Sequence, residues 1–183
     1  SELKPSEEAS GRRLKLSNHH SRWDFILDPQ RPAVFLDLCH RNTTVRSRVE
    51  AETTVELILA LLEHGIPSEE IGVVVPYRAQ SRLIRSLLRR QINDEAVIGK
   101  LAVDTVERMQ GQEREVILVS LTTSSSAFAL KMAGFLLQPQ RLNVSVTRPR
   151  TKLIILGSHQ MLTGLAQDPV HKELYDILND LLN

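Results

Sequence analysis

The sequence predicts an open α/β fold, in which a parallel sheet carries helices on both faces. Short apolar runs alternate with longer segments whose apolar residues recur every three or four positions, the pattern of strands followed by helices. The run at residues 71–75 is apolar apart from one glycine, as in a strand buried on both faces of a parallel sheet. The chain has 183 residues, enough for one domain of this kind.

The elements can be followed along the chain. We expect strands at residues 33–37, 71–75, 101–105, 115–121 and 152–157. We expect helices at residues 50–64, 79–91 and 139–148, and a closing helix that begins after Asp168 and Pro169. Gly65 suits the position just beyond a helix C-terminus. Residues 1–25 are polar and lack periodicity, so we expect a linker or the end of a preceding domain there, and one domain over residues 26–183.

Composition narrows the class of protein. Hydrophobic residues make up 42% of the chain and charged residues 25%, as in soluble globular domains. Cys39 is the only cysteine, which excludes an internal disulfide framework, and no apolar run is long enough to span a membrane. We expect an intracellular protein, cytoplasmic or nuclear. The net charge is +1, so a nucleic-acid contact must come from a local basic patch. The pair His19–His20 has no second pair at ligand spacing, and we expect no metal site.

The first of three candidate segments follows the strand at residues 71–75. Ligands of open parallel sheets bind beyond the carboxyl ends of the strands. Tyr77 can stack on a base there, and Arg78 can bind phosphate oxygens through its planar guanidinium. Further arginines continue at helical spacing, at Arg82, Arg85 and Arg89. For those three, a solvated cationic face is the alternative that we favour.

The second segment covers residues 103–115. Gly111 permits a tight turn or a close approach of the backbone to a ligand. Gln110 and Glu113 add hydrogen-bonding groups, and a carboxylate suits ribose hydroxyls. A polar turn between two strands explains the same residues equally well.

The third segment covers residues 140–150. Arg141 and Arg148 are seven residues apart, so on a helix they share a face, with Ser145 between them. Two guanidiniums aimed in one direction suit an anion such as a phosphate. The alternative is that both arginines pair with surface carboxylates.

Taken in order, the three segments resemble motifs IV, V and VI of the superfamily 1B helicases. The resemblance is strongest to the group that includes the nonsense-mediated-decay helicase, senataxin and the DNA-replication helicase–nucleases. It runs from about residue 34 to about residue 162, and its most specific part is Arg-Leu-Asn-Val-Ser-Val-Thr-Arg at residues 141–148. The other matching positions are residues 50–51, 71–72, 76–80, 104–107, 110–114 and 134–136.

The resemblance implies the C-terminal RecA-like motor domain of an ATP-dependent helicase or translocase that moves 5′ to 3′. Arg148 matches the arginine finger that reaches the γ-phosphate of ATP, and Arg78 or Arg82 matches a second phosphate sensor. Arg141 is expected to face the same nucleotide.

The remaining positions carried over concern the nucleoside and the nucleic-acid strand. Glu113 matches the acid that contacts ribose and Gly111 its supporting turn, while Tyr77 and Gln80 are expected to line the nucleotide cleft. Candidate contacts to a single DNA or RNA strand are Thr105, Thr122 and Thr123, the last two in the loop at residues 122–126.

Two positions depart from the family pattern. Pro149 follows the finger arginine where a small residue is usual, and proline disfavours a helical conformation at Arg148. Ser47 stands where relatives usually carry asparagine, before the pair Glu50-Ala51.

A phosphate-binding loop of the Gly-x-x-x-x-Gly-Lys-Ser/Thr type is absent from the sequence, as is an Asp-Glu pair that ends an apolar strand. The ligands of Mg²⁺ and the cradle for ATP phosphates are therefore expected in a first RecA-like domain of the same polypeptide. We expect the chain to be inactive alone. The alternative is a degenerate motor domain that serves as a nucleic-acid or protein binding module, for which Pro149 is the main support.

Overall fold

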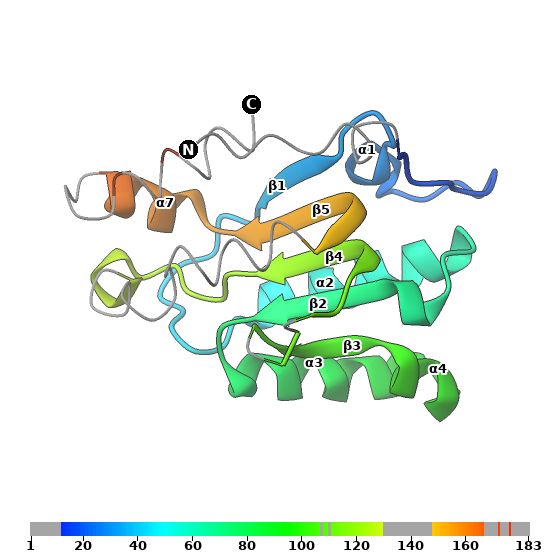
Figure 1. The fold of residues 1–183 in the computed structure, drawn as a ribbon. Helices are drawn as coiled ribbons and strands as arrows, with labels where there is room; N and C mark the ends of the chain where they lie inside the picture. The colour runs from blue at the N-terminus through cyan, green and yellow to red at the C-terminus, as the bar shows by residue number, and fades with distance from the viewer. Residues whose placement is uncertain are drawn as a thin grey trace.

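A computed structural model describes residues 12–106, 108–109, 111–129, 148–166, 172 and 176. These residues form a five-stranded sheet with the order β1-β5-β4-β2-β3, and every neighbouring pair is parallel (Figure 1). The strands are β1 (Ala33–Asp37), β2 (Ile71–Val75), β3 (Ala102–Thr105), β4 (Arg114–Ser120) and β5 (Pro149–Gly157). The predicted open parallel α/β fold is confirmed.

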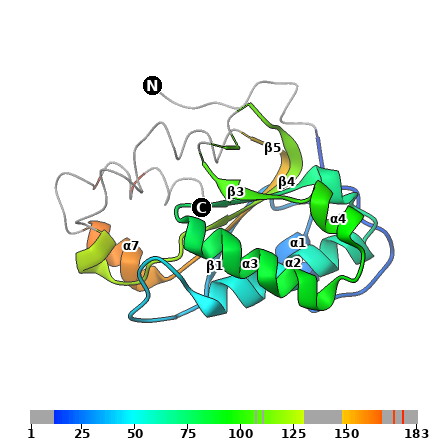
Figure 2. The same cartoon turned by 90° about the horizontal axis from the view of Figure 1, so that it is seen from below.

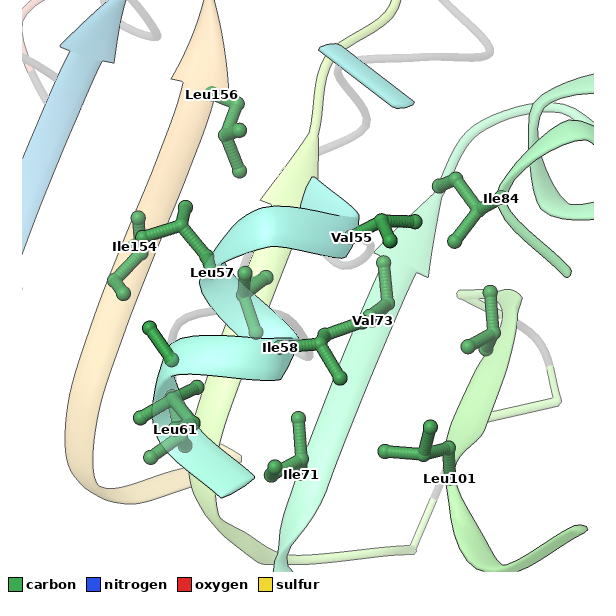
Figure 3. Packing of buried hydrophobic residues seen from close by; sticks show 14 of the residues in the cluster. Val55, Leu57, Ile58, Leu61, Ile71, Val73, Ile84, Leu101, Ile154 and Leu156 are labelled. Atoms are coloured by element: carbon green, nitrogen blue, oxygen red, sulfur yellow. The ribbon is translucent and has the colours of Figure 1, made fainter. Parts of the chain in front are cut away.

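Two long helices cover one face of this sheet (Figure 2). They are α2 (Arg48–Glu63) and α3 (Arg78–Gln91). Leu57, Ile58 and Leu61 of α2 are fully buried; Ile58 points toward Val73 of β2, and Leu57 lies beside Ile154 of β5 (Figure 3). Each such aliphatic side chain contributes about 1.5–3 kcal/mol when it leaves water, so this face is a main source of stability.

The opposite face of the sheet is also apolar. Ile117 and Ile155 are buried there, together with Met161 and Leu162 of α7 (His159–Ala166). Burial on both faces explains why the strands lack a polar alternation. The helices expected at residues 139–148 and after Asp168 lie outside the described residues, apart from Arg148 and from Lys172 and Asp176, which are helical.

Short elements complete the described fold. They are α1 (Asp24–Leu27), the 3-10 turn η1 (Ser68–Glu70) and α4 (Glu95–Lys100). Gly65 ends α2 with a φ of 85°, and its N–H donates to the carbonyl of Leu62 at 3.0 Å. This left-handed conformation favours glycine, so the predicted helix end is confirmed. Among the described residues, no helix is long and apolar enough to cross a membrane.

Part of the N-terminal segment, for which a linker or the end of a preceding domain is expected, contacts the core of the described fold. Leu14 is buried in the core, the Ser17 N–H donates to the His64 carbonyl at 3.1 Å, and His64 Nδ1 contacts the Ser17 carbonyl at 3.3 Å. Residues 12–23 therefore belong to the packed unit. The few apolar side chains of this segment have no helical or strand periodicity, because residues 12–23 form neither a helix nor a strand.

A buried lysine ties the α1–β1 connection to the sheet. The side chain of Lys152 on β5 is almost completely buried, and its Nζ donates to the carbonyl of Asp28 at 3.0 Å and to that of Arg31. Burial lowers the pKa of Lys152 to about 8. The two carbonyls accept hydrogen bonds from the ammonium group, but they stabilise its charge less well than water does, so the pKa remains lowered.

Candidate nucleotide and nucleic-acid site

The first predicted segment lies at the carboxyl end of β2. Tyr77 is the residue before α3, and Arg78 is the first residue of that helix. The Arg78 side chain is exposed and makes no hydrogen bond or ion pair with the described residues. The Tyr77 ring lies 6.4 Å from that of Phe128, and burial raises its pKa to about 12. The carboxyl end of β2 therefore presents the exposed guanidinium of Arg78 beside the neutral, half-buried phenol of Tyr77.

Gln80 is placed differently from its neighbours. Its side chain is fully buried, and its Oε1 accepts from the backbone N–H of Ser47 at 2.9 Å. Its Nε2 donates to the Ser47 carbonyl at 2.9 Å and to the Ser120 hydroxyl at 3.1 Å. A direct contact with a nucleotide requires these bonds to break, so Gln80 is better suited to hold the starts of α2 and α3 together.

Glu50 forms the centre of a buried polar network at the same end of the sheet. Its carboxylate is completely buried, and it contacts His40 Nε2 at 2.6 Å. It accepts from the Ser120 hydroxyl at 2.6 Å and from the backbone N–H of Thr122 at 2.8 Å. One carboxylate thus joins the β1–α2 loop, helix α2 and the loop that follows β4.

Thr122 and Thr123, the predicted strand contacts, lie inside this network. Both side chains are fully buried, and Thr123 Oγ1 donates to the Thr43 carbonyl at 3.0 Å. Thr122 adopts a φ of 70° and gives its N–H to Glu50. The N–H groups of Ser124 and Ser125 both reach the Thr43 carbonyl. In this conformation neither hydroxyl is directed at a ligand, and their role as strand contacts stays a prediction.

Thr105 ends β3 at the edge of the sheet. It is aligned with Val75 of β2, next to the first segment, and its carbonyl accepts from the backbone N–H of Arg108 at 3.0 Å. Its side chain is nearly buried. Because β2 lies between β3 and β4, Thr105 and Thr122 do not belong to one cluster.

Gly111, Glu113 and Arg148 meet at the other end of the sheet. The backbone N–H of Arg114, the first residue of β4, donates to the Arg148 carbonyl at 3.1 Å. Glu113 is exposed and has no partner among the described residues, and Gly111 has a φ of 81° with nothing near its Cα that excludes a ligand. This set of residues is called the β4–β5 junction below.

Arg148 has a buried side-chain nitrogen without a hydrogen-bond partner in the described part of the chain. Its Nε is buried and has no acceptor among the described residues. Arg150, two residues on, is instead held by Glu70 and by Glu115 at 3.2 Å, and these carboxylates raise its pKa. Arg141 lies outside the described residues.

The structure corrects one expectation about these segments. The rule of carboxyl ends holds for Tyr77 and Arg78, but Arg148 precedes the amino end of β5, which begins at Pro149. A segment that leads into a strand reaches the opposite end of the sheet from one that follows a strand. The amino ends of β4 and β5 curve together away from α2 and α3 (Figure 2).

The residues of the Glu50 network other than Thr122 were not among the predicted site residues. A local signal existed, because Ser47 and Glu50 have the spacing of a capping box. The Ser47 hydroxyl does accept from the Glu50 N–H at 3.3 Å. The Glu50 carboxylate turns inward instead of back to Ser47, and the residues that receive it are up to 72 positions away. The described residues contain no cluster of His, Cys, Asp and Glu that is suited to a metal ion.

Comparison with known proteins identifies relatives of the chain. A family model described as an AAA domain matches residues 1–160. The DNA replication ATP-dependent helicase/nuclease of Saccharomyces cerevisiae is 32% identical over 172 residues, which cover 89% of this chain and 11% of that protein. The DNA polymerase alpha-associated DNA helicase A of the same yeast is 38% identical over 107 residues, 58% of this chain and 15% of that protein.

A third relative comes from a plant. The regulator of nonsense transcripts 1 homolog of Arabidopsis thaliana is 30% identical over 142 residues, which cover 74% of this chain and 11% of that protein. The chain therefore spans only 11–15% of the length of these three relatives.

Proposed function

The chain belongs to the AAA domain family and is a superfamily 1B helicase domain with a RecA-like fold, and we propose that it is the second motor domain of an ATP-dependent helicase or translocase. In this role it meets a first RecA-like domain that holds ATP and Mg²⁺. The observation that carries the proposal is the β4–β5 junction, where Arg148 Nε lacks an acceptor and Glu113 lacks a donor among the described residues.

The junction residues suit a nucleotide in chemistry. Bound ATP with Mg²⁺ supplies the phosphoryl group and most of the charge to be stabilised. Arg148 then binds an oxygen of the γ-phosphate, and a guanidinium in that place stabilises the charge that develops in the transition state. The exposed carboxylate of Glu113 accepts hydrogen bonds from ribose hydroxyls, and Gly111 leaves room for the sugar. Arg141 is a further proposed contact with the nucleotide. Tyr77 lies at the opposite end of the sheet from this junction, and its contact with the nucleotide stays a prediction.

Arg78 has a separate place in this proposal. It stands at the start of α3, where the helix N–H groups also favour an anion. Its guanidinium is exposed, so it is free to bind a phosphate when the two motor domains close. Gln80 acts here as a positioning residue, because its amide fixes the first turn of α3 against Ser47.

A substitution at Arg148 in the full-length protein tests the proposal. Arg148→Ala is expected to lower kcat for ATP hydrolysis by about 10³-fold or more, because the transition state loses its guanidinium. The affinity for ATP should change little. Arg148→Lys, which keeps the charge but loses the planar fork, should recover only a small part of kcat. Normal turnover with weakened ATP binding would contradict the assigned role.

The alternative of a degenerate binding module is not favoured by Pro149. Proline is tolerated at the first residue of a strand, and Pro149 occupies that position in β5. The isolated 183-residue chain separates the alternatives further. We expect no ATPase above background from it, with or without single-stranded DNA or RNA, because the sequence has no phosphate-binding loop. Strand-stimulated hydrolysis by this chain alone would contradict the division of labour between two domains.

A further inference from the structure

The loop between β1 and α2, residues 38–47, has a rigid base at the carboxyl end of the sheet. It lies beside the loop that follows β4, beyond the strand arrowheads (Figure 1). Thr43 is the main point of contact: its Oγ1 donates to the Thr122 carbonyl at 2.9 Å, and its N–H donates to the Ser124 hydroxyl at 3.0 Å. His40 and Ser47 are also buried, held by Glu50 and Gln80. The loop is thus anchored at three places.

The residues between these anchors point outward. Arg41 follows the anchor His40, Arg46 precedes the anchor Ser47, and both arginines are exposed. Neither side chain has a hydrogen-bond or ion-pair partner among the described residues. Some other surface arginines are neutralised by carboxylates, for example Arg48 by Glu52 at 2.7 Å. Arg41 and Arg46 thus place two cations without carboxylate partners among the described residues on a loop of fixed conformation, which is typical of a site that binds a polyanion.

The surroundings of the two arginines suit one kind of polyanion in particular. Asn42, with a φ of 59°, and Thr44 are exposed hydrogen-bonding residues between them. Val45, beside Arg46, has 41% of its surface exposed, and it is one of only three large hydrophobic residues exposed in the described part of the chain. Cations, polar groups and an apolar side chain together match a nucleic-acid strand, whose phosphates alternate with sugars and bases.

We propose that Arg41 and Arg46 bind the phosphodiester backbone of a single DNA or RNA strand, and that Thr122 and Thr123 support their loop from within the domain. This inference rests on the proposed function, in which a strand crosses the second motor domain. The Thr122 N–H is held by Glu50 and the Thr123 hydroxyl by Thr43, so these two residues support the loop from within and the exposed arginines come from the β1–α2 loop. Because the loop is already fixed, little ordering is needed when the strand binds.

The test uses the full-length helicase with Arg41 and Arg46 both changed to alanine. Binding of fluorescent oligo-dT and oligo-U is measured by anisotropy over a range of salt concentrations. The affinity at moderate salt is expected to fall about 10-fold or more, and the slope of log K against log salt should decrease by about 1.4, since a single strand contributes about 0.7 per phosphate contact. Hydrolysis should need more strand for half-maximal stimulation but reach the same kcat.

Matched variants make the outcome specific. Arg90→Ala removes one exposed cation from the far end of α3 and should leave strand affinity near the wild-type value. Changing Arg41 and Arg46 to lysine should keep most of the salt dependence, because the charges remain. Thermal melting of each variant should match the wild type, since both arginines are exposed and have no hydrogen-bond or ion-pair partner among the described residues. If the double alanine variant loses no more strand affinity than Arg90→Ala, or if its salt slope is unchanged, the inference is wrong.

The proposed function and this inference fail in different ways. If the wild-type protein shows no strand-stimulated ATPase, the motor assignment is wrong and the loop has no strand to bind. If the wild type is stimulated normally and the double alanine variant binds both oligonucleotides as tightly, only the inference is wrong. A defect with one oligonucleotide alone identifies the strand class that the loop serves and still supports it.

Discussion

The two ends of the sheet differ in how their polar groups are used. At the carboxyl end, Glu50 accepts from the Thr122 N–H and Thr43 donates to the Thr122 carbonyl, and the Glu50 carboxylate is completely buried. At the β4–β5 junction, Glu113 is exposed and Arg148 Nε has no acceptor among the described residues. A closed network fixes geometry, whereas unpaired groups remain available to a ligand. The difference suggests that the Glu50 network is a frame for the loops at the first end, whereas the β4–β5 junction is a contact site.

Removing Glu50 should have the largest effect on the frame. Glu50→Ala leaves the Thr122 N–H and the His40 ring without their acceptor and opens a cavity. Buried polar groups that lose their partners cost about 1–3 kcal/mol each, so we expect about 3–5 kcal/mol less free energy of unfolding. Urea unfolding of the 183-residue chain, followed by circular dichroism, measures this loss.

Two controls accompany that measurement. Glu50→Gln keeps the shape and one acceptor oxygen, so its cost should be clearly smaller than that of alanine. Glu52→Gln changes an exposed carboxylate on the same helix, whose partner is Arg48, and should cost less than about 0.5 kcal/mol. If Glu50→Ala costs no more than Glu52→Gln, the network does not act as a frame.

The strands were predictable from the sequence because their signal is local. A run of apolar residues marks β2 with the same bounds that the structure has, 71–75. The start of β5 was missed by three residues, because Pro149, Arg150 and Thr151 are not apolar. Their strand conformation follows instead from pairing with β4 and from the carboxylates that hold Arg150.

The site was less predictable because its contacts are distant in sequence. The motifs located Arg78, Glu113 and Arg148, but not the end of the sheet at which each lies. The Glu50 network joins residues separated by up to 72 positions, and no single segment carries its pattern. From sequence alone, a loop rich in Ser and Thr is expected at the surface, although a buried carboxylate such as that of Glu50 can hold a residue such as Thr122 inside the domain.

Lys152 is a buried charged residue on β5, so not every polar group toward the amino ends of the strands is exposed. Its pKa is about 8 in the folded chain and near 10.5 when unfolded. Between these values the unfolded chain holds a proton that the folded chain has released, so stability should rise with pH. The difference corresponds to about 2–3 kcal/mol over this window. Comparison of wild type with Lys152→Met by urea unfolding at pH 7.5 to 10.5 measures it. The variant should lack this increase, and an equal increase in both proteins would contradict the burial argument.

A smaller effect is expected at Gly111. Its φ of 81° disfavours any other residue, but a Cβ there meets no atom within 4 Å. Gly111→Ala should therefore cost only the backbone strain, about 1 kcal/mol. Thermal or urea unfolding gives the value, and Gly99→Ala, at a glycine without the positive φ and with equal space around it, is the matched control. A loss of several kcal/mol would mean that the turn is packed rather than open.

The smallest effect on stability is expected at Glu113. This carboxylate is exposed and has no partner among the described residues, so Glu113→Ala should change the free energy of unfolding by less than about 0.5 kcal/mol. In the full-length protein the same change should raise KM for ATP several-fold, because a charged acceptor for ribose hydroxyls is lost, while kcat falls less than it does for Arg148→Ala. Glu113→Gln, which keeps an acceptor oxygen, should lie between alanine and wild type. If the alanine variant destabilises the chain and leaves KM unchanged, Glu113 belongs to the frame, and the contrast between the two ends of the sheet is wrong.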